Sequence, residues 1–256
     1  MRKLNREERE ARTPSTYRKH YSAADAAHYL ESKESAGSHR AELRLIDRAL
    51  RHVGPEEQVL DLPCGAARIT LHLLRRGLRV TAADVSAPMI ALARQRIDPA
   101  GLRAGILVAD AENAPFEDRA FDTVLCFRLF HHFPDDELRV RVIRELCRIA
   151  SRRVILSFFT VRCFTYWKRR WQSFRRGRPM TSYYVPKENV AAWFADEGFR
   201  VVDTVARTMR ALCLAVAERK ARHLSDREPR TVDVEAPRPL VTALPPGHDG
   251  PSGLPT

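Results

Sequence analysis

Three aspartates and a pair of histidines follow four successive apolar segments in this chain of 256 residues. Asp61, Asp84 and Asp110 come at the ends of the first three segments, and His131-His132 follow the fourth. If the segments are parallel strands, these side chains meet at one edge of the sheet, where α/β proteins bind ligands. A carboxylate at Asp84 suits the two hydroxyls of a ribose, and one at Asp110 suits the exocyclic amine of adenine. The set therefore predicts an adenosine-binding site.

The loop after the first segment indicates which adenosine cofactor fits. Residues 61–67 read DLPCGAA, and such small residues let backbone N–H groups approach a ligand at a helix N-terminus. A dinucleotide site uses the glycines of G-x-G-x-x-G to admit a pyrophosphate, whereas this loop contains only Gly65. S-adenosylmethionine has no phosphate, and its ammonium needs an acceptor that Asp61 and nearby carbonyls supply. The loop therefore favours a sulfonium cofactor over NAD.

The segments that must position these residues alternate between strand and helix patterns. Strands are expected at 58–62, 79–83, 106–109, 121–127, 153–159, 199–205 and 211–217. Helical spacing occupies 22–50 and 69–76, and further helices are expected to begin at Ser86, at Asp135 or Asp136, and at Pro186. This alternation, with continuous apolar strands, predicts an α/β fold with a doubly wound, mostly parallel seven-stranded sheet whose last strand is antiparallel.

Composition divides the chain into three parts. Residues 1–50 form a charged segment and a capping helix, and 51–221 form the ligand-binding domain with a basic, aromatic insertion at 160–185. Residues 222–256 are rich in proline and are expected to be disordered. The net charge of +12, from 44 basic and 32 acidic residues, favours an anionic partner such as nucleic acid, a phosphorylated metabolite or a membrane surface. An arginine-rich, solvated surface explains the same excess.

Cysteine usage and the length of apolar runs bear on the compartment. The five cysteines include no C-x-x-C pair, which argues against a disulfide framework and a zinc site, so no metal is expected. The charged N-terminus lacks an apolar signal region, and the longest apolar runs are too short to cross a bilayer. These features predict a cytoplasmic protein.

Together the motifs resemble class I S-adenosylmethionine-dependent methyltransferases of the bacterial small-molecule type, over residues 58–217. The family's first motif, D-x-G-x-G-x-G, aligns with Asp61, Pro63, Gly65 and Ala67, so two of its glycines are replaced. The resemblance implies an enzyme with a Rossmann-like fold and S-adenosyl-L-methionine as its cofactor. The residues that it places beside the cofactor are Asp61, Pro63, Cys64, Gly65, Asp84, Val85, Met89, Asp110, Ala111, Glu112, Phe127 and His132.

Methyl transfer from a sulfonium is an in-line displacement, so such a protein must chiefly align the nucleophile, the methyl group and the sulfur. A base is needed only where the nucleophile must lose a proton. His131 is the candidate catalytic base, and His132 is assigned to the cofactor. The alternative is that both histidines pack against or cap the turn before Pro134.

The basic, aromatic insertion is the candidate acceptor region. The candidate acceptor-binding residues are Tyr17, Tyr21, Arg169, Arg170, Tyr183 and Tyr184. Aromatic side chains beside cations suit a small or lipid-like acceptor, anionic or quinone-like, or peripheral docking on the anionic inner membrane surface. The alternatives are an RNA-modifying methyltransferase, a catalytically silent cofactor-binding partner protein, and a solvated lid over the site. The acceptor atom, whether O, N or C, and the oligomeric state stay open.

Overall fold

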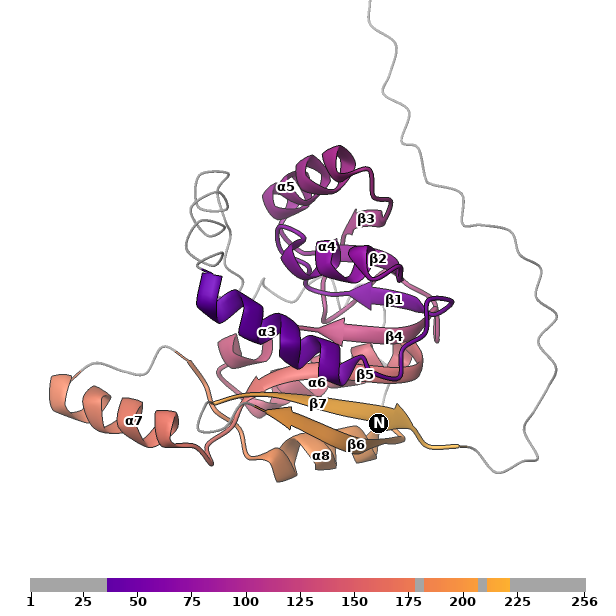
Figure 1. Cartoon of the computed structure of the whole chain (residues 1–256). Helices are drawn as coiled ribbons and strands as arrows, with labels where there is room; N and C mark the ends of the chain where they lie inside the picture. The colour runs from indigo at the N-terminus through magenta and orange to yellow at the C-terminus, as the bar shows by residue number, and fades with distance from the viewer. Residues whose placement is uncertain (1–35, 178–181, 207–210, 222–256) are drawn as a thin grey trace, which may run out of the picture. The chain divides into compact units, whose positions relative to one another are not determined.

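The computed structural model describes residues 36–177, 182–206 and 211–221, which contain one seven-stranded sheet (Figure 1). The strands are β1 Gln58–Asp61, β2 Arg79–Asp84, β3 Gly105–Val108, β4 Phe121–Cys126, β5 Ala150–Phe159, β6 Phe199–Ala206 and β7 Leu212–Arg219. Their order is β3-β2-β1-β4-β5-β7-β6. Strands β1 to β5 pair in parallel, and β7 is antiparallel to both β5 and β6. The predicted fold class is therefore confirmed, including the antiparallel last strand.

Helices connect the strands as the sequence pattern predicts. The helices are α3 Ala36–Ala49, α4 Arg68–Arg75, α5 Ala87–Ile97, α6 Asp136–Ile149, α7 Phe164–Arg176 and α8 Lys187–Asp196. Ser86 caps α5 by accepting a hydrogen bond from the backbone N–H of Met89. Asp135, the earlier of the two residues at which this helix was expected to begin, accepts from Leu138 N at 2.8 Å and caps α6.

Two apolar cores lie on opposite faces of the sheet. One holds Val142 of α6 and Phe194 of α8, and the other holds Ile46 of α3 and Leu73 of α4, all four essentially inaccessible to solvent. Neighbouring residues of a central strand alternate between these cores, as β1, β4 and β5 do. Both faces of the sheet are therefore buried, which explains the continuous apolar runs that identified the strands in the sequence.

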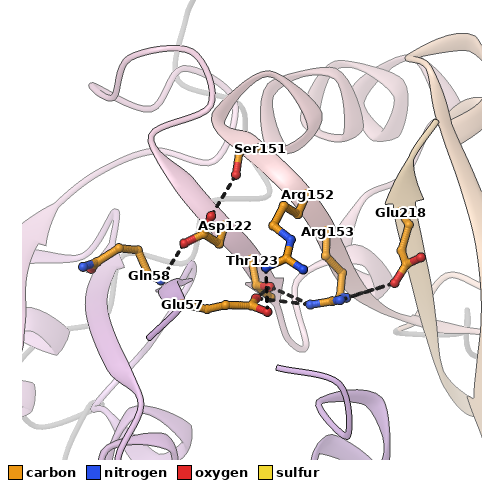
Figure 2. A network of polar contacts seen from close by, with 8 residues as sticks. All are labelled: Glu57, Gln58, Asp122, Thr123, Ser151, Arg152, Arg153 and Glu218. Carbon is orange, nitrogen blue, oxygen red and sulfur yellow. Dashed lines mark hydrogen bonds and ion pairs between the residues drawn. The ribbon is translucent and has the colours of Figure 1, made fainter. Parts of the chain in front are cut away.

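A polar network closes the edge of the sheet where β1, β4 and β5 begin (Figure 2). Glu57, 2% exposed, accepts hydrogen bonds from Thr123 Oγ1 at 2.8 Å and from Arg153 Nη1 at 3.2 Å. Arg153 also pairs with Glu218 of β7 at 3.3 Å. Each of these buried charges has a partner, so the network at this edge of the sheet has a structural role.

Helix α7 is the main element that the sequence pattern did not predict. The insertion at 160–185 was expected only to interrupt the strand–helix alternation, but residues 164–176 form a helix. Its first turn is capped by Cys163, whose Sγ accepts from Tyr166 N at 3.3 Å. None of its residues is buried. The tail 222–256 and most of the segment 1–50, with Tyr17 and Tyr21, lie outside the described residues.

Candidate functional site

The predicted site residues gather at the carboxyl edge of the sheet. Asp61 is the last residue of β1, Asp84 is the last residue of β2, and Asp110 follows β3. Strand β1 lies between β2 and β4, and its connections diverge to opposite sides of this position. An open α/β sheet binds ligands at such a switch point. The ordered acids of the sequence therefore reach the place where a ligand is expected.

The loop after β1 keeps a left-handed backbone conformation at Ala67, where the family motif has glycine. Gly65 has φ of +53°, and Ala67, at a position where the family motif has glycine, has φ of +59°. The loop is held by hydrogen bonds from Cys64 N to Ala83 O at 2.8 Å and from Gly65 N to Asp84 Oδ2 at 2.9 Å. A Cβ built on Gly65 would have no atom within 4 Å. Open space therefore adjoins Gly65.

Asp61 is fully buried and incompletely paired. Its Oδ2 accepts a hydrogen bond from Thr70 Oγ1 at 2.7 Å, while its Oδ1 has no partner among the described residues. Burial is the largest influence on its carboxyl group and raises the pKa to about 7, partly offset by the Thr70 hydrogen bond. An unpaired buried acceptor is costly unless a ligand supplies the donor. Asp61 therefore fits a cationic ligand group such as an ammonium.

Asp84 both holds the loop and keeps capacity for a ligand. Its Oδ2 accepts from Gly65 N and its Oδ1 accepts from Ser86 N, both at 2.9 Å. Burial raises the pKa of this carboxyl group, and the two backbone donors oppose that effect. Each carboxylate oxygen has a second lone pair, so two hydroxyls can still donate to it. This donor–acceptor arrangement fits a ribose.

The loop after β3 is ordered by its own side chains. Asp110 Oδ1 accepts from Glu112 N at 3.1 Å, and its backbone carbonyl accepts from Asn113 N at 3.1 Å. Ala111 is buried between them. The carboxylate of Glu112 pairs with Arg141 of α6 at 3.4 Å. Asp110 therefore shapes the loop at the strand end, and the Glu112 side chain contacts α6.

The two histidines lie in an aromatic row. They end a short 3₁₀ turn at Phe130–His132, and His131 is buried. The His131 ring lies 4.0 Å from that of His132 and stacks on Phe159 at 4.5 Å between centroids. Tyr184 continues the row, 5.6 Å from Phe159, and Tyr183 N donates to His131 O at 3.0 Å. We name His131, His132, Phe159, Tyr184 and Tyr166 the aromatic row, because the Tyr166 ring lies 5.0 Å from Tyr184.

The other predicted cofactor residues differ in how far they reach this edge. Pro63 is half-buried and Val85 is exposed. Cys64 is buried with its Sγ 3.3 Å from Gly65 O, and burial raises the pKa of its thiol. Met89 is 2% exposed, and Phe127 packs into the core that contains α3 and α4. Both side chains are therefore buried, and their contact with a cofactor stays a prediction.

The acceptor candidates lie partly on α7. Arg169 Nη1 donates to the Tyr184 hydroxyl at 3.1 Å, and Arg170 Nη1 lies 3.5 Å from the Tyr166 hydroxyl. The structure therefore brings Arg169 and Tyr184 together at the end of the aromatic row.

Glu42 is a functional candidate that the sequence reasoning missed. This α3 carboxylate accepts from Arg68 Nη2 at 2.8 Å and from Arg128 Nη1 at 2.9 Å. Arg68 follows the β1 loop, and Arg128, with φ of +62°, follows β4. Glu42 thus connects α3 to both loops beside the candidate cofactor site. Nothing local in the sequence marks it, because both partners are far away along the chain.

The sheet order resembles that of solved methyltransferase structures. Residues 59–152 match the family model described as a methyltransferase domain. Over 117 residues the chain is 35% identical to a demethylmenaquinone methyltransferase of Thermus thermophilus, across 45% of this chain and 52% of that protein. Over 146 residues it is 32% identical to the demethylmenaquinone methyltransferase of Thermotoga maritima, across 52% of this chain and 60% of that protein. The match thus spans little more than half of each relative.

Solved structures support the same fold. Magnesium protoporphyrin IX methyltransferase from Synechocystis, solved with bound SAH, superposes with a TM-score of 0.60 at 18% identity, covering 75% of this chain and 87% of that one. At this identity the likeness shows the fold alone, and residues 59–152 are the part of the chain that matches the methyltransferase-domain model.

The described residues contain neither a metal-binding cluster nor a membrane-spanning helix. Among them no group of three or more His, Cys, Asp or Glu side chains could hold a metal ion. None of the helices in these ranges combines the length and the apolar character needed to span a bilayer.

Proposed function

We propose that this protein is an enzyme that transfers a methyl group from S-adenosylmethionine to a small, amphiphilic acceptor with a planar, quinone-like ring. The observation that carries the proposal is the pairing of a buried, unsatisfied Asp61 Oδ1 with open space at Gly65. An ammonium would donate to Asp61 Oδ1. A ligand without phosphate suits the space at Gly65, because the loop contains only one glycine. The match of residues 59–152 to the methyltransferase-domain family supports this reading.

Bound S-adenosylmethionine would supply a methyl group already activated by the sulfonium. Asp61 would accept the ammonium, Asp84 would accept the ribose hydroxyls, and Asp110 with Ala111 would face the adenine ring. Glu42 would keep both flanking loops in register through its two arginine partners. The contribution of the protein is therefore alignment for in-line displacement, in the protected environment of the strand ends.

The aromatic row supports a planar acceptor. The half-buried rings of the row, His132 and Tyr184, are the ones beside which another flat ring can stack. Arg169 at the far end of the row adds a cation for an anionic or carbonyl oxygen. Two relatives are demethylmenaquinone methyltransferases by name, which agrees with a quinone-like acceptor.

His131 is the proposed base for an acceptor that must lose a proton. Replacing it with glutamine should lower kcat at neutral pH and remove one inflection of the pH–rate profile, while leaving the affinity for S-adenosylmethionine unchanged. His72→Gln is the matched control, since His72 is a half-buried histidine of α4 outside the site. If both variants lower activity equally at every pH, His131 only packs the turn.

The cofactor assignment is tested by calorimetry with S-adenosylmethionine on the full chain. Asp84→Ala should abolish binding, because it removes the ribose acceptor and releases Gly65. Asp98→Asn, on the exposed turn after α5, is the matched control and should bind as the parent does. Unchanged binding in Asp84→Ala would refute the assignment of S-adenosylmethionine to this site.

The acceptor class is tested with labelled S-adenosylmethionine, supplied in turn with demethylated naphthoquinones and with total tRNA. Label should enter the quinone fraction. Label confined to RNA would replace this proposal with an RNA-modifying activity. Cofactor binding without labelling of quinones, RNA or a cell extract would support the catalytically silent partner instead.

A further inference from the structure

Helix α7 carries an exposed aromatic stripe. Phe164, Trp167, Trp171 and Phe174 are 62%, 63%, 58% and 86% exposed. Their spacing of three, four and three residues places all four on one side of a helix. We define these residues as the α7 stripe. Contiguous exposed apolar surface of this kind marks an interaction site.

Cations flank the α7 stripe on both sides. With about 100° between successive residues of a helix, Lys168 and Arg175 fall on one flank of the stripe and Arg170 falls on the other. Arg175 lies over the Trp171 ring, 4.7 Å from its centroid. The sequence of α7 contains no acidic residue. An apolar stripe between rows of cations is the pattern of a helix that lies in the plane of a membrane interface.

We infer that α7 docks on an anionic phospholipid bilayer, with the α7 stripe in the headgroup–acyl boundary and its flanking cations on lipid phosphates. Tryptophan is well suited to this depth, because its ring is apolar and its N–H can reach water. Charge complementarity selects an anionic bilayer over a neutral one, since three flanking cations would meet negative headgroups. Docking of this kind needs no spanning helix.

The opposite side of α7 connects the membrane-facing stripe to the methyl-transfer site. Tyr166 lies on that side, and its ring is 5.0 Å from Tyr184 of the aromatic row. The row then runs through Phe159 to His131 at the strand ends. A bilayer under α7 would therefore lie at one end of a continuous series of rings. This route suits a lipid-soluble acceptor, and in that respect the inference rests on the proposed function.

The test is flotation of the full chain with vesicles of phosphatidylglycerol and phosphatidylcholine, and with phosphatidylcholine alone. The parent should float with the anionic vesicles and remain below with the neutral ones. The triple variant Lys168→Gln/Arg170→Gln/Arg175→Gln should lose on the order of 100-fold in partition, from three cations near the surface. The variant Trp167→Gln/Trp171→Gln should lose at least tenfold, because it removes the insertion of apolar rings.

A matched control removes the same charge elsewhere. Arg75, Arg79 and Arg103 are exposed cations outside α7, and their triple replacement by glutamine should leave partition within twofold of the parent. Equal losses in both triple variants would show a general charge effect and overturn the inference. Three other results would also overturn the inference. The first is flotation that the α7 replacements do not reduce, and the second is binding of the parent to RNA but not to vesicles. The third is a parent that does not bind vesicles but forms a dimer that the tryptophan variant abolishes.

Cofactor calorimetry on the same variants separates this inference from the proposed function. The α7 variants should bind S-adenosylmethionine as the parent does, because α7 lies at the far end of the aromatic row. Lost flotation with retained cofactor binding supports the docking role of α7. Failure of the parent to bind S-adenosylmethionine while it still floats would refute the proposed activity and leave docking intact.

Discussion

The ionisation of Asp61 gives a quantitative test of the site. Complete burial raises the pKa of this carboxyl group from 3.8 to about 7. At 1.36 kcal/mol for each pH unit, that difference corresponds to about 4 kcal/mol of folding free energy. The folded chain holds its proton over a pH range where the unfolded chain has released it. Stability from this group is therefore fully present below about pH 4 and is lost as pH rises to about 7.

Asp61→Asn removes this titration and keeps the shape of the side chain. In the absence of cofactor, the free energy of unfolding of the parent should fall by up to about 4 kcal/mol from pH 4 to pH 7, relative to the variant. At pH 8 the variant should be the more stable protein, by less than that amount, because its amide N–H groups lack acceptors and cost about 1–3 kcal/mol.

Urea unfolding at pH 4, 5, 6, 7 and 8 measures the difference between parent and variant. Subtracting the two curves cancels the contribution of every other titrating group. Asp98→Asn, at an exposed position, should give a curve parallel to that of the parent. A parent and an Asp61→Asn variant with parallel curves would refute the reasoning, since Asp61 would then titrate alike in both states.

The cationic cofactor should offset the cost of ionising Asp61 in its buried position. An ammonium at Asp61 favours the ionised carboxylate. As the pH is raised towards about 7, the affinity for S-adenosylmethionine should therefore increase by up to tenfold for each pH unit, and above about pH 7 it should be constant. Calorimetry across the same pH values should show this slope for the parent and a flat profile for Asp61→Asn. A flat parent profile would mean that Asp61 does not meet the ammonium.

Three further substitutions test neighbouring parts of the structure. Gly65→Val should lower the affinity for S-adenosylmethionine at least 100-fold in calorimetry, because a branched side chain is strained at φ of +53° and would fill the open space. Glu42→Gln should weaken binding about tenfold through the loss of two charge-assisted hydrogen bonds, and an unchanged Kd would show that α3 only packs there. Glu57→Gln should cost about 3 kcal/mol in urea unfolding, because Arg153 loses its buried counter-charge and keeps only the half-exposed Glu218. Glu218→Gln should cost under about 1 kcal/mol.

The sequence predicted the features that depend on neighbours along the chain. All seven strands were expected from apolar runs, and Ser86 was expected as a cap from its place before Pro88. The three strand-end acids followed from the fold, since parallel strands bring their carboxyl ends together. Local patterns are enough for these features because strand pairing and capping act over short stretches.

Features that depend on distant contacts could not be predicted in the same way. Glu42 is one of many helical acids in the sequence, and only folding brings it to two arginines. The cofactor assignment of Met89 and Phe127 stays a prediction, and the structure adds that both side chains are buried, Phe127 in the core that contains α3 and α4. Helix α7 was missed because its aromatic spacing faces solvent, where no packing partner reinforces the pattern.

The two edges of the sheet differ in how their buried charges are satisfied, and this contrast locates the function. At the edge where β1, β4 and β5 begin, Glu57 and Arg153 neutralise each other within the protein (Figure 2). At the other edge, Asp61 keeps an unpaired oxygen and an elevated pKa. A fold optimised only for stability would have paired or replaced this carboxylate, as the first edge does. A buried acid with one unpaired oxygen at the switch point fits the proposed ligand, which would bring the missing positive charge.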